Sequence, residues 1–152
     1  GLRVSETASL KIRDIDSKSM AIKVCSGKGQ KDRYTLLAAT TLRFLRGYWQ
    51  MYRPASWLFE GRVSSYPLNT STLQRVFMKA KEKAGINKKV SMHSLRHAFA
   101  THLLEQGVDI HAVQRLLGHR SIATTTVYLH LKKESLMKVV SPLDFSSDEE
   151  KT

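Results

Sequence analysis

The first third of the chain changes from a helical spacing of apolar residues to an alternating one. Leu2, Glu6 and Leu10 recur at intervals of four, which places them on one face of a short helix over residues 2–10. Three runs with alternating apolar positions follow, and they predict half-buried strands. These runs are residues 12–15, 20–25 and 33–37. Because Gly27 and Gly29 permit positive φ angles between the last two runs, we expect a small antiparallel sheet closed by a hairpin.

From residue 41 onward the helical period returns. Leu42, Leu45, Trp49 and Tyr52 form one apolar stripe, which predicts a helix that ends before Pro54. We expect this stripe to face the core rather than to stack on nucleic-acid bases.

Capping residues and glycines divide the remaining sequence into further helices. Ser71 and Gln74 match a capping box, and Gly85 stops the helix that follows. Asp109 caps a later helix that stops at Gly118. The predicted helices are residues 71–84, 94–106, 110–117, 121–128 and 134–140. Together with the sheet, they predict an α+β fold, mostly helical, with a three-stranded antiparallel sheet near the N-terminus.

The length and the net charge of the chain indicate the number of domains and the class of binding partner. A chain of 152 residues fits one domain. Its formal net charge is +12, and residues 1–143 alone hold 24 basic and nine acidic residues and carry +15. Such a charge favours a polyanionic partner, either nucleic acid or an anionic membrane surface. The acidic end at 144–152 has little that is apolar to bury, so we expect a disordered tail there.

The apolar runs and the cysteine content of the chain indicate the cellular compartment in which it works. No apolar run is long enough for a membrane span, and no signal segment opens the chain, so we expect a soluble protein. The single cysteine, Cys25, cannot form an internal disulfide and favours a reducing compartment. The chain begins at Gly1 without Met, which suggests that it is a piece of a longer protein.

Candidate chemistry is concentrated in the last third of the chain. His93 and Arg96 are three residues apart, so they share one face of a helical turn. His119 and Tyr128 are nine residues apart and would lie on opposite faces of an unbroken helix. Gly118 and Ser121, which can cap a new helix, supply a break that would allow these two side chains to converge.

Arg3 and Lys28, far upstream, could complete a cluster with these four residues. Such a set suits phosphodiester transfer without a metal. Two guanidinium groups can hold the non-bridging phosphate oxygens, and a tyrosine hydroxyl can attack phosphorus. A lysine ammonium can protonate the departing oxygen, while the imidazoles orient a phosphate oxygen or share in proton transfer. The sequence therefore predicts neither a metal nor another cofactor.

Four short motifs stand in order along the chain. They are GLRVSE at 1–6, GKGQKDR at 27–33, HSLRHAFATHL at 93–103, and LLGH at 116–119 followed by Tyr128. In this order and spacing, residues 1–131 resemble the tyrosine recombinase family, also called the phage integrase family, which includes the Xer-type recombinases that resolve chromosome dimers. The resemblance implies that Arg3 and Arg96 hold the phosphate, Lys28 is the general acid, His93 and His119 assist, Tyr128 is the nucleophile and Glu6 braces the site.

The resemblance also implies a reaction and partners. It implies cutting and rejoining of double-stranded DNA through a 3′-phosphotyrosyl intermediate, without metal or nucleotide cofactor. A homo-oligomer, a tetramer on paired sites, is expected of the full-length protein, in the cytoplasm and without a membrane. Residues 1–143 would then be a catalytic domain without its usual first helices and without the core-binding domain that precedes it in the family.

Parts of the sequence are also compatible with other functions, namely a DNA-binding module, an inactive relative of the family and a metal site. The segments 109–117 and 121–128 could form a non-catalytic helix-turn-helix DNA-binding module, and an inactive relative of the family would keep only DNA affinity. His93, His97 and His102 could suggest zinc, but no carboxylate lies in the required context. Asp14 and Asp16 are too few carboxylates for two-metal chemistry, so turn formation is favoured. The remaining histidines are assigned to structure or surface, namely His97, His102, His111 and His130.

Overall fold

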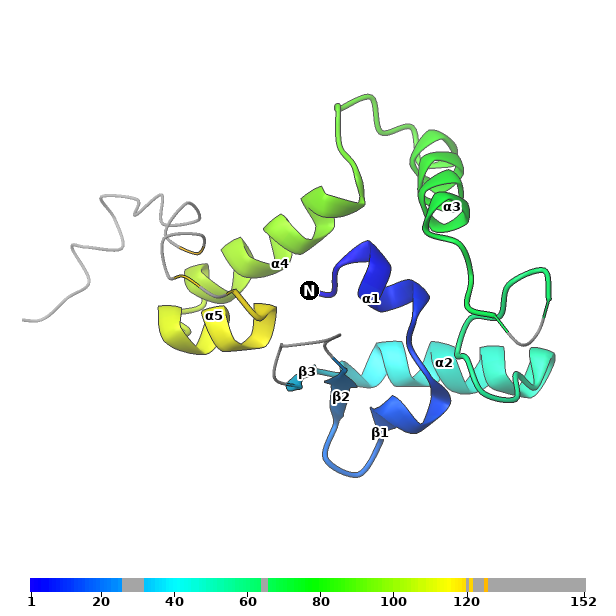
Figure 1. The fold of residues 1–152 in the computed structure, drawn as a ribbon. Coiled ribbons are helices and arrows are strands. Elements are labelled where there is room, and N and C mark those ends of the chain that lie inside the picture. The colour runs from blue at the N-terminus through cyan, green and yellow to red at the C-terminus, as the bar shows by residue number, and fades with distance from the viewer. Residues whose placement is uncertain (26–31, 64–65, 120, 122–124, 126–152) are drawn as a thin grey trace, which may run out of the picture.

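The computed structural model of the chain describes residues 1–25, 32–63, 66–119, 121 and 125. Over these residues a short helix, a 3₁₀ turn and three strands are followed by four longer helices (Figure 1). The hairpin predicted at 26–31, the helix predicted at 134–140 and the acidic tail lie outside the described residues, as does most of the helix predicted at 121–128.

The three-stranded antiparallel sheet predicted near the N-terminus is confirmed. Its strands are β1 (Ile15–Asp16), β2 (Ala21–Val24) and β3 (Arg33–Leu36), in the order β1-β2-β3. Ile22 and Val24 are buried, as the alternation predicts, and Val24 lies opposite Arg33 in the register. The strand predicted at 12–15 is wrong for most of its length, because Ile12–Asp14 form the 3₁₀ turn η1. The Asp14 carboxylate stabilises this turn by accepting the Lys11 N–H at 2.8 Å.

The first helix, α1 (Val4–Ala8), is shorter than the predicted 2–10. Arg3 has extended backbone angles and forms the N-cap, and its N–H donates to Glu6 Oε2 at 2.7 Å. At the other end the Ser9 hydroxyl donates to the Ser5 carbonyl at 2.9 Å. This local arrangement places the side chains of Arg3 and Glu6 beside each other.

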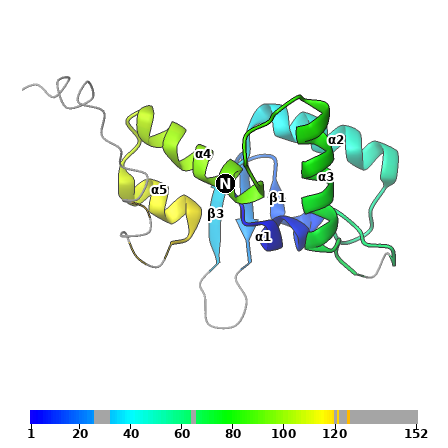
Figure 2. The same cartoon turned by 90° about the horizontal axis from the view of Figure 1, so that it is seen from above.

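Helix α2 (Ala39–Tyr52) ends before Pro54, as predicted. Leu42 is buried in the core, but Trp49 is 40% and Tyr52 is 63% exposed, so the prediction of a core-facing stripe fails for the second half. That half extends beyond the sheet (Figure 2). There the guanidinium of Arg53 stacks over the Trp49 ring at 4.3 Å.

The later helices follow the predicted pattern with small changes at their starts. They are α3 (Thr70–Lys83), α4 (Met92–Glu105) and α5 (Ile110–Leu117). The cap of α3 is Asn69 rather than Ser71, since Asn69 Oδ1 accepts the Ser71 N–H at 2.9 Å. Helix α4 begins two residues earlier than predicted, which places His93 in its first turn. Asp109 caps α5 as predicted.

Two clusters of buried apolar residues organise the molecule. The first joins the sheet to α2 and consists of Leu10, Ile22, Leu37, Leu42 and Leu58. The second joins α4 to α5 and consists of Ala100, Val113 and Leu117. In both views α4 and α5 lie together on one side, α2 and α3 lie on the other, and α1 lies between them (Figures 1 and 2). A membrane-crossing helix needs a longer apolar stretch than any helix among the described residues provides.

Candidate active site

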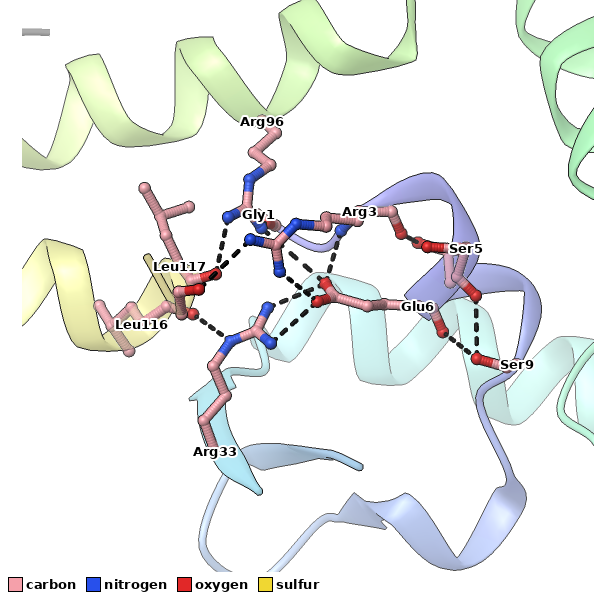
Figure 3. Close-up of polar contacts among 11 residues, drawn as sticks. Gly1, Arg3, Ser5, Glu6, Ser9, Arg33, Arg96, Leu116 and Leu117 are labelled. Carbon is pink, nitrogen blue, oxygen red and sulfur yellow. Dashed lines mark hydrogen bonds and ion pairs between the residues drawn. The ribbon is translucent and has the colours of Figure 1, made fainter. Parts of the chain in front are cut away.

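The carboxylate of Glu6 faces three guanidinium groups, which come from α4, β3 and the start of α1 (Figure 3). Arg33 donates to both of its oxygens, from Nη1 to Oε1 at 2.9 Å and from Nη2 to Oε2 at 2.8 Å. Arg3 Nη1 donates to Oε1 at 2.8 Å, and Arg96 Nη1 lies 3.8 Å from Oε2. We call Arg3, Arg33 and Arg96 the arginine cluster. The role of Glu6 as a bracing acid, implied by the resemblance, agrees with this geometry.

The same three side chains cap the C-terminal end of α5. Its last carbonyl groups have no partner inside the helix and form the negative end of the helix dipole, so cationic donors stabilise them. The pairs are Arg33 Nε with Leu116 O at 3.1 Å, Arg96 Nη2 with Leu117 O at 2.6 Å, and Arg3 Nη2 with Gly118 O at 3.2 Å. Contacts far apart in the sequence thus join α1, β3 and α4 to one end of α5.

The three arginines differ in their access to solvent. The side chain of Arg3 is 42% exposed, that of Arg33 11% and that of Arg96 2%. Arg96 also donates from Nη1 to the Gly1 carbonyl at 2.7 Å. The structure therefore brings Arg3 and Arg96 together, as the resemblance implies. Arg3 is the most exposed of the three, while Arg96 is buried and donates to backbone carbonyls.

His119 is held next to this cluster by the chain reversal at the end of α5. Gly118 has a φ of 68°, which permits the reversal, and the His119 N–H donates to the Gln114 carbonyl at 3.2 Å. The Gln114 side-chain amide donates in return to the His119 carbonyl at 3.1 Å. On the imidazole, Nδ1 lies 2.9 Å from Oγ1 of Thr125, whose side chain is fully buried.

His93 approaches the same region from the first turn of α4. It is exposed and lies three residues before the buried Arg96. It also lines a cavity of about 290 Å³ together with Val4 of α1 and Phe77 of α3. Its position next to α1 is consistent with the predicted approach to a phosphate held by Arg3.

Electrostatics favour an anionic ligand at this place. Burial alone would raise the pKa of Glu6, but the hydrogen bonds from Arg33 and Arg3 outweigh it and lower that pKa to about 2. Burial, followed by the positive charges of the arginine cluster, lowers the pKa of His119 to about 4. At neutral pH one carboxylate therefore faces three cations beside a neutral imidazole, and two positive charges remain in excess.

Of the residues predicted for the site, the structure brings together Arg3, Glu6, Arg96 and His119, with His93 nearby. Lys28 and Tyr128 lie outside the described residues.

Two residues were missed by sequence reasoning. Arg33 ends the GKGQKDR motif, and the alternation of β3 places it on the inward face with the buried Thr35. An arginine at an inward strand position was the available signal, because a buried charge requires a partner. Thr125 stands in a run of three threonines, and nothing in the sequence distinguishes it from its neighbours.

The described residues offer little to a metal ion. Among them, no three His, Cys, Asp or Glu side chains are grouped closely enough to hold one. Asp14 and Asp16 instead bind backbone N–H groups. Asp16 Oδ1 accepts from Lys18 and Ser19 at 2.9 and 3.0 Å, as expected of turn formation.

Comparison with known proteins places this site in a family context. The sequence pattern of the phage integrase family matches residues 1–135. The chain is 46% identical to the integrase/recombinase y4qK of Sinorhizobium fredii, over 95% of this chain and 47% of that protein. It is 40% identical to tyrosine recombinase XerA of Pyrococcus furiosus, over 92% of this chain and 49% of that protein. The chain thus spans about half the length of these relatives.

A solved structure shows the same fold. In the pre-cleavage complex of the XerH site-specific recombinase with its difH substrate, XerH is 28% identical to this chain. The two structures agree with a TM-score of 0.76, over 99% of this chain and 44% of XerH. The predicted fold class is confirmed, and a stand-alone helix-turn-helix module is not favoured.

Proposed function

The chain belongs to the phage integrase family, also called the tyrosine recombinases, and from that premise we propose that it cuts and rejoins DNA strands through a covalent 3′-phosphotyrosyl intermediate. The arginine cluster is the observation that carries this proposal. Three guanidinium groups around one carboxylate leave an excess positive charge next to His119, and fixed guanidinium donors suit the oxygens of a phosphodiester.

Each residue of the predicted site has a task in this reaction. Tyr128 releases its hydroxyl proton to an imidazole of the site or to solvent as its Oη attacks phosphorus, a bond forms between Oη and phosphorus, and the bond from phosphorus to the 5′ oxygen breaks. Lys28 gives its proton to the departing 5′ oxygen. Arg3 and Arg96 stabilise the charge that develops on the non-bridging oxygens, and His93 and His119 orient an oxygen or share in proton transfer. Rejoining reverses these steps, with a 5′ hydroxyl attacking the phosphotyrosine.

The wider assembly follows from the same premise. We propose that residues 1–143 form the catalytic domain, followed by the acidic tail 144–152, and that the partner is double-stranded DNA. The full-length protein would act as a homo-oligomer, a tetramer on paired sites, in the cytoplasm. The net charge of +12 and the similarity to a recombinase solved on DNA support the choice of partner.

Covalent capture tests this function without knowledge of the target site. A library of nicked duplexes of random sequence is incubated with the protein, and adducts that survive denaturation are isolated and sequenced. The nick leaves only a short fragment between the cleavage site and the nick. This fragment carries the 5′ hydroxyl needed for rejoining and diffuses away, so the adduct accumulates. We expect a protein–DNA band that protease treatment removes.

The variant Tyr128→Phe provides the control. It removes one hydroxyl, so the adduct should disappear while DNA binding, measured by gel shift, stays within about twofold. An adduct that persists in Tyr128→Phe would identify another nucleophile, and its absence from the unaltered protein would contradict the proposed activity.

A further inference from the structure

The hydrogen bond between His119 and Thr125 has no task in the reaction described above. The backbone of His119 is held on both sides by Gln114, through the two hydrogen bonds at the end of α5. With its backbone held in this way, the His119 side chain can still move by rotation of the imidazole. The contact of 2.9 Å between Nδ1 and Thr125 Oγ1 restricts that rotation.

We propose that Thr125 is a positioning residue whose hydroxyl donates to Nδ1 of His119 and thereby keeps the imidazole proton on Nε2, the nitrogen from which His119 can donate to a phosphate oxygen. This inference rests on the proposed function, because it concerns how His119 meets a phosphate.

The 2.9 Å contact allows either direction, so we infer the direction of the hydrogen bond from the charge state of the ring and from the ligand that Nε2 would meet. Burial and the positive charges of the arginine cluster lower the pKa of His119 to about 4, so the imidazole is neutral at pH 7. A neutral imidazole carries one N–H, and the hydrogen bond made by one nitrogen decides which nitrogen holds it. With the proton on Nδ1, Nε2 would present a lone pair to a phosphate oxygen and repel it. A threonine hydroxyl that donates to Nδ1 avoids this outcome.

Burial makes this contact persistent. Thr125 is fully buried, so water cannot replace its partner, and a buried hydroxyl without a hydrogen bond is costly. The hydrogen bond therefore holds the imidazole of His119 against a buried partner.

Two substitutions at Thr125 separate hydrogen bonding from packing. Thr125→Val keeps the shape and removes the hydroxyl, while Thr125→Ser keeps the hydroxyl and removes a methyl group. Rates of adduct formation are measured on a nicked duplex selected by covalent capture with the unaltered protein. We expect Thr125→Val to slow the reaction roughly tenfold, about the value of one hydrogen bond. Thr125→Ser should stay within roughly threefold of the unaltered protein.

A double substitution identifies the residue through which Thr125 acts. In a His119→Ala background, Thr125→Val should slow the reaction no further, because the group that it positions is already absent. Unchanged rates in Thr125→Val would overturn the inference. Equal slowing by Val and Ser, or a Val effect that multiplies with His119→Ala, would also overturn it, since either result means that Thr125 serves packing alone.

Nitrogen-15 NMR of the imidazole gives a readout independent of activity. We expect the Nε2–H tautomer of His119 in the unaltered protein and in Thr125→Ser, and a mixture of tautomers in Thr125→Val. A predominant Nδ1–H tautomer in the unaltered protein would contradict the inference. If no DNA forms an adduct, the proposed function fails, and this measurement still decides whether Thr125 sets the tautomer.

Discussion

Glu6 accepts four hydrogen bonds, one from the backbone N–H of Arg3, one from the Arg3 guanidinium and two from Arg33. Its carboxylate is therefore ionised far below the usual pH, with a pKa of about 2 instead of 4.5. Because the folded pKa is the lower one, the stabilisation is fully present above pH 4.5 and is lost as the pH falls toward 2. Arg33 is the strongest partner, since it binds both oxygens with 11% of its side chain exposed.

Replacing Arg33 with Lys tests this pairing at the scale of one residue. A lysine cannot reproduce the bidentate contact with Glu6 or the third bond to Leu116 O. We expect the free energy of unfolding at pH 7 to fall by about 1–3 kcal/mol. The difference from the unaltered protein should shrink between pH 4.5 and 2, as Glu6 becomes protonated in both.

The control for this prediction is Arg43→Lys, because Arg43 is exposed on α2. It should leave the unfolding free energy within about 0.5 kcal/mol. Chemical denaturation followed by circular dichroism across this pH range measures both variants. A difference at Arg33 that does not change with pH would show that Glu6 is not the group it stabilises.

At the scale of elements, the end of α5 determines where the site forms. Its carbonyl groups receive donors from α1, β3 and α4, and the reversal at Gly118 directs His119 toward the arginine cluster. Two features of the structure disfavour any side chain at Gly118. Its φ is 68°, and a Cβ there would lie 2.7 Å from Cδ and Nε of Arg33, whose guanidinium is fixed by Glu6 and Leu116.

Substitution of three helix-terminal glycines by alanine separates these two constraints. Gly85 and Gly107 have φ angles of 65° and 82°, and a Cβ at either would meet nothing within 4 Å. Gly85→Ala and Gly107→Ala should each cost about 1–2 kcal/mol, the strain of a left-handed alanine. Gly118→Ala should cost more and should also slow adduct formation, because Arg33 must move. Similar unfolding midpoints for all three variants would contradict this role of Gly118.

At the scale of the whole molecule, the polar site connects two apolar cores. The sheet and α2 share one cluster, and α4 and α5 share the other. Polar contacts cross between the two halves, because Arg33 of β3 donates to Leu116 O in α5 and Arg96 of α4 lies 3.8 Å from the Glu6 carboxylate. Hydrogen bonds of this kind need defined geometry, whereas apolar contacts need only proximity. The network therefore fixes the relative placement of the two halves at the position where the phosphate would bind.

The net charge predicts how the whole chain binds DNA. With +15 on residues 1–143, contacts to phosphates should dominate and sequence preference should be small for this chain alone. The logarithm of the binding constant for a random duplex should fall linearly with the logarithm of the salt concentration, with a slope of about 0.9 per phosphate neutralised. Fluorescence anisotropy in a NaCl series measures this slope. A duplex with an uncharged backbone is the control, and a binding constant insensitive to salt would rule out a phosphate footprint.

Much of the fold could be predicted from local sequence. Apolar spacing and stop residues predicted α5 to the residue, and strand alternation predicted which side of β2 is buried, because both depend on neighbours only a few positions away. The motifs likewise contain Arg3, Glu6, Arg96 and His119, whose side chains the structure brings together. Local patterns were less successful at boundaries, such as the 3₁₀ turn at Ile12–Asp14, where a side chain competes for backbone hydrogen bonds.

The sequence by itself determined the helices, the sheet, the excess of positive charge and the residue types available for phosphate chemistry. The tertiary structure alone decided that Arg33 pairs with Glu6, 27 residues away, and that Arg96 donates to Leu117, 21 residues away. It also decided that the second half of α2 is exposed. The physical reason is the same in each case. Periodicity specifies which face of an element is apolar, but the partner of a buried charge is set by how separate elements pack against each other.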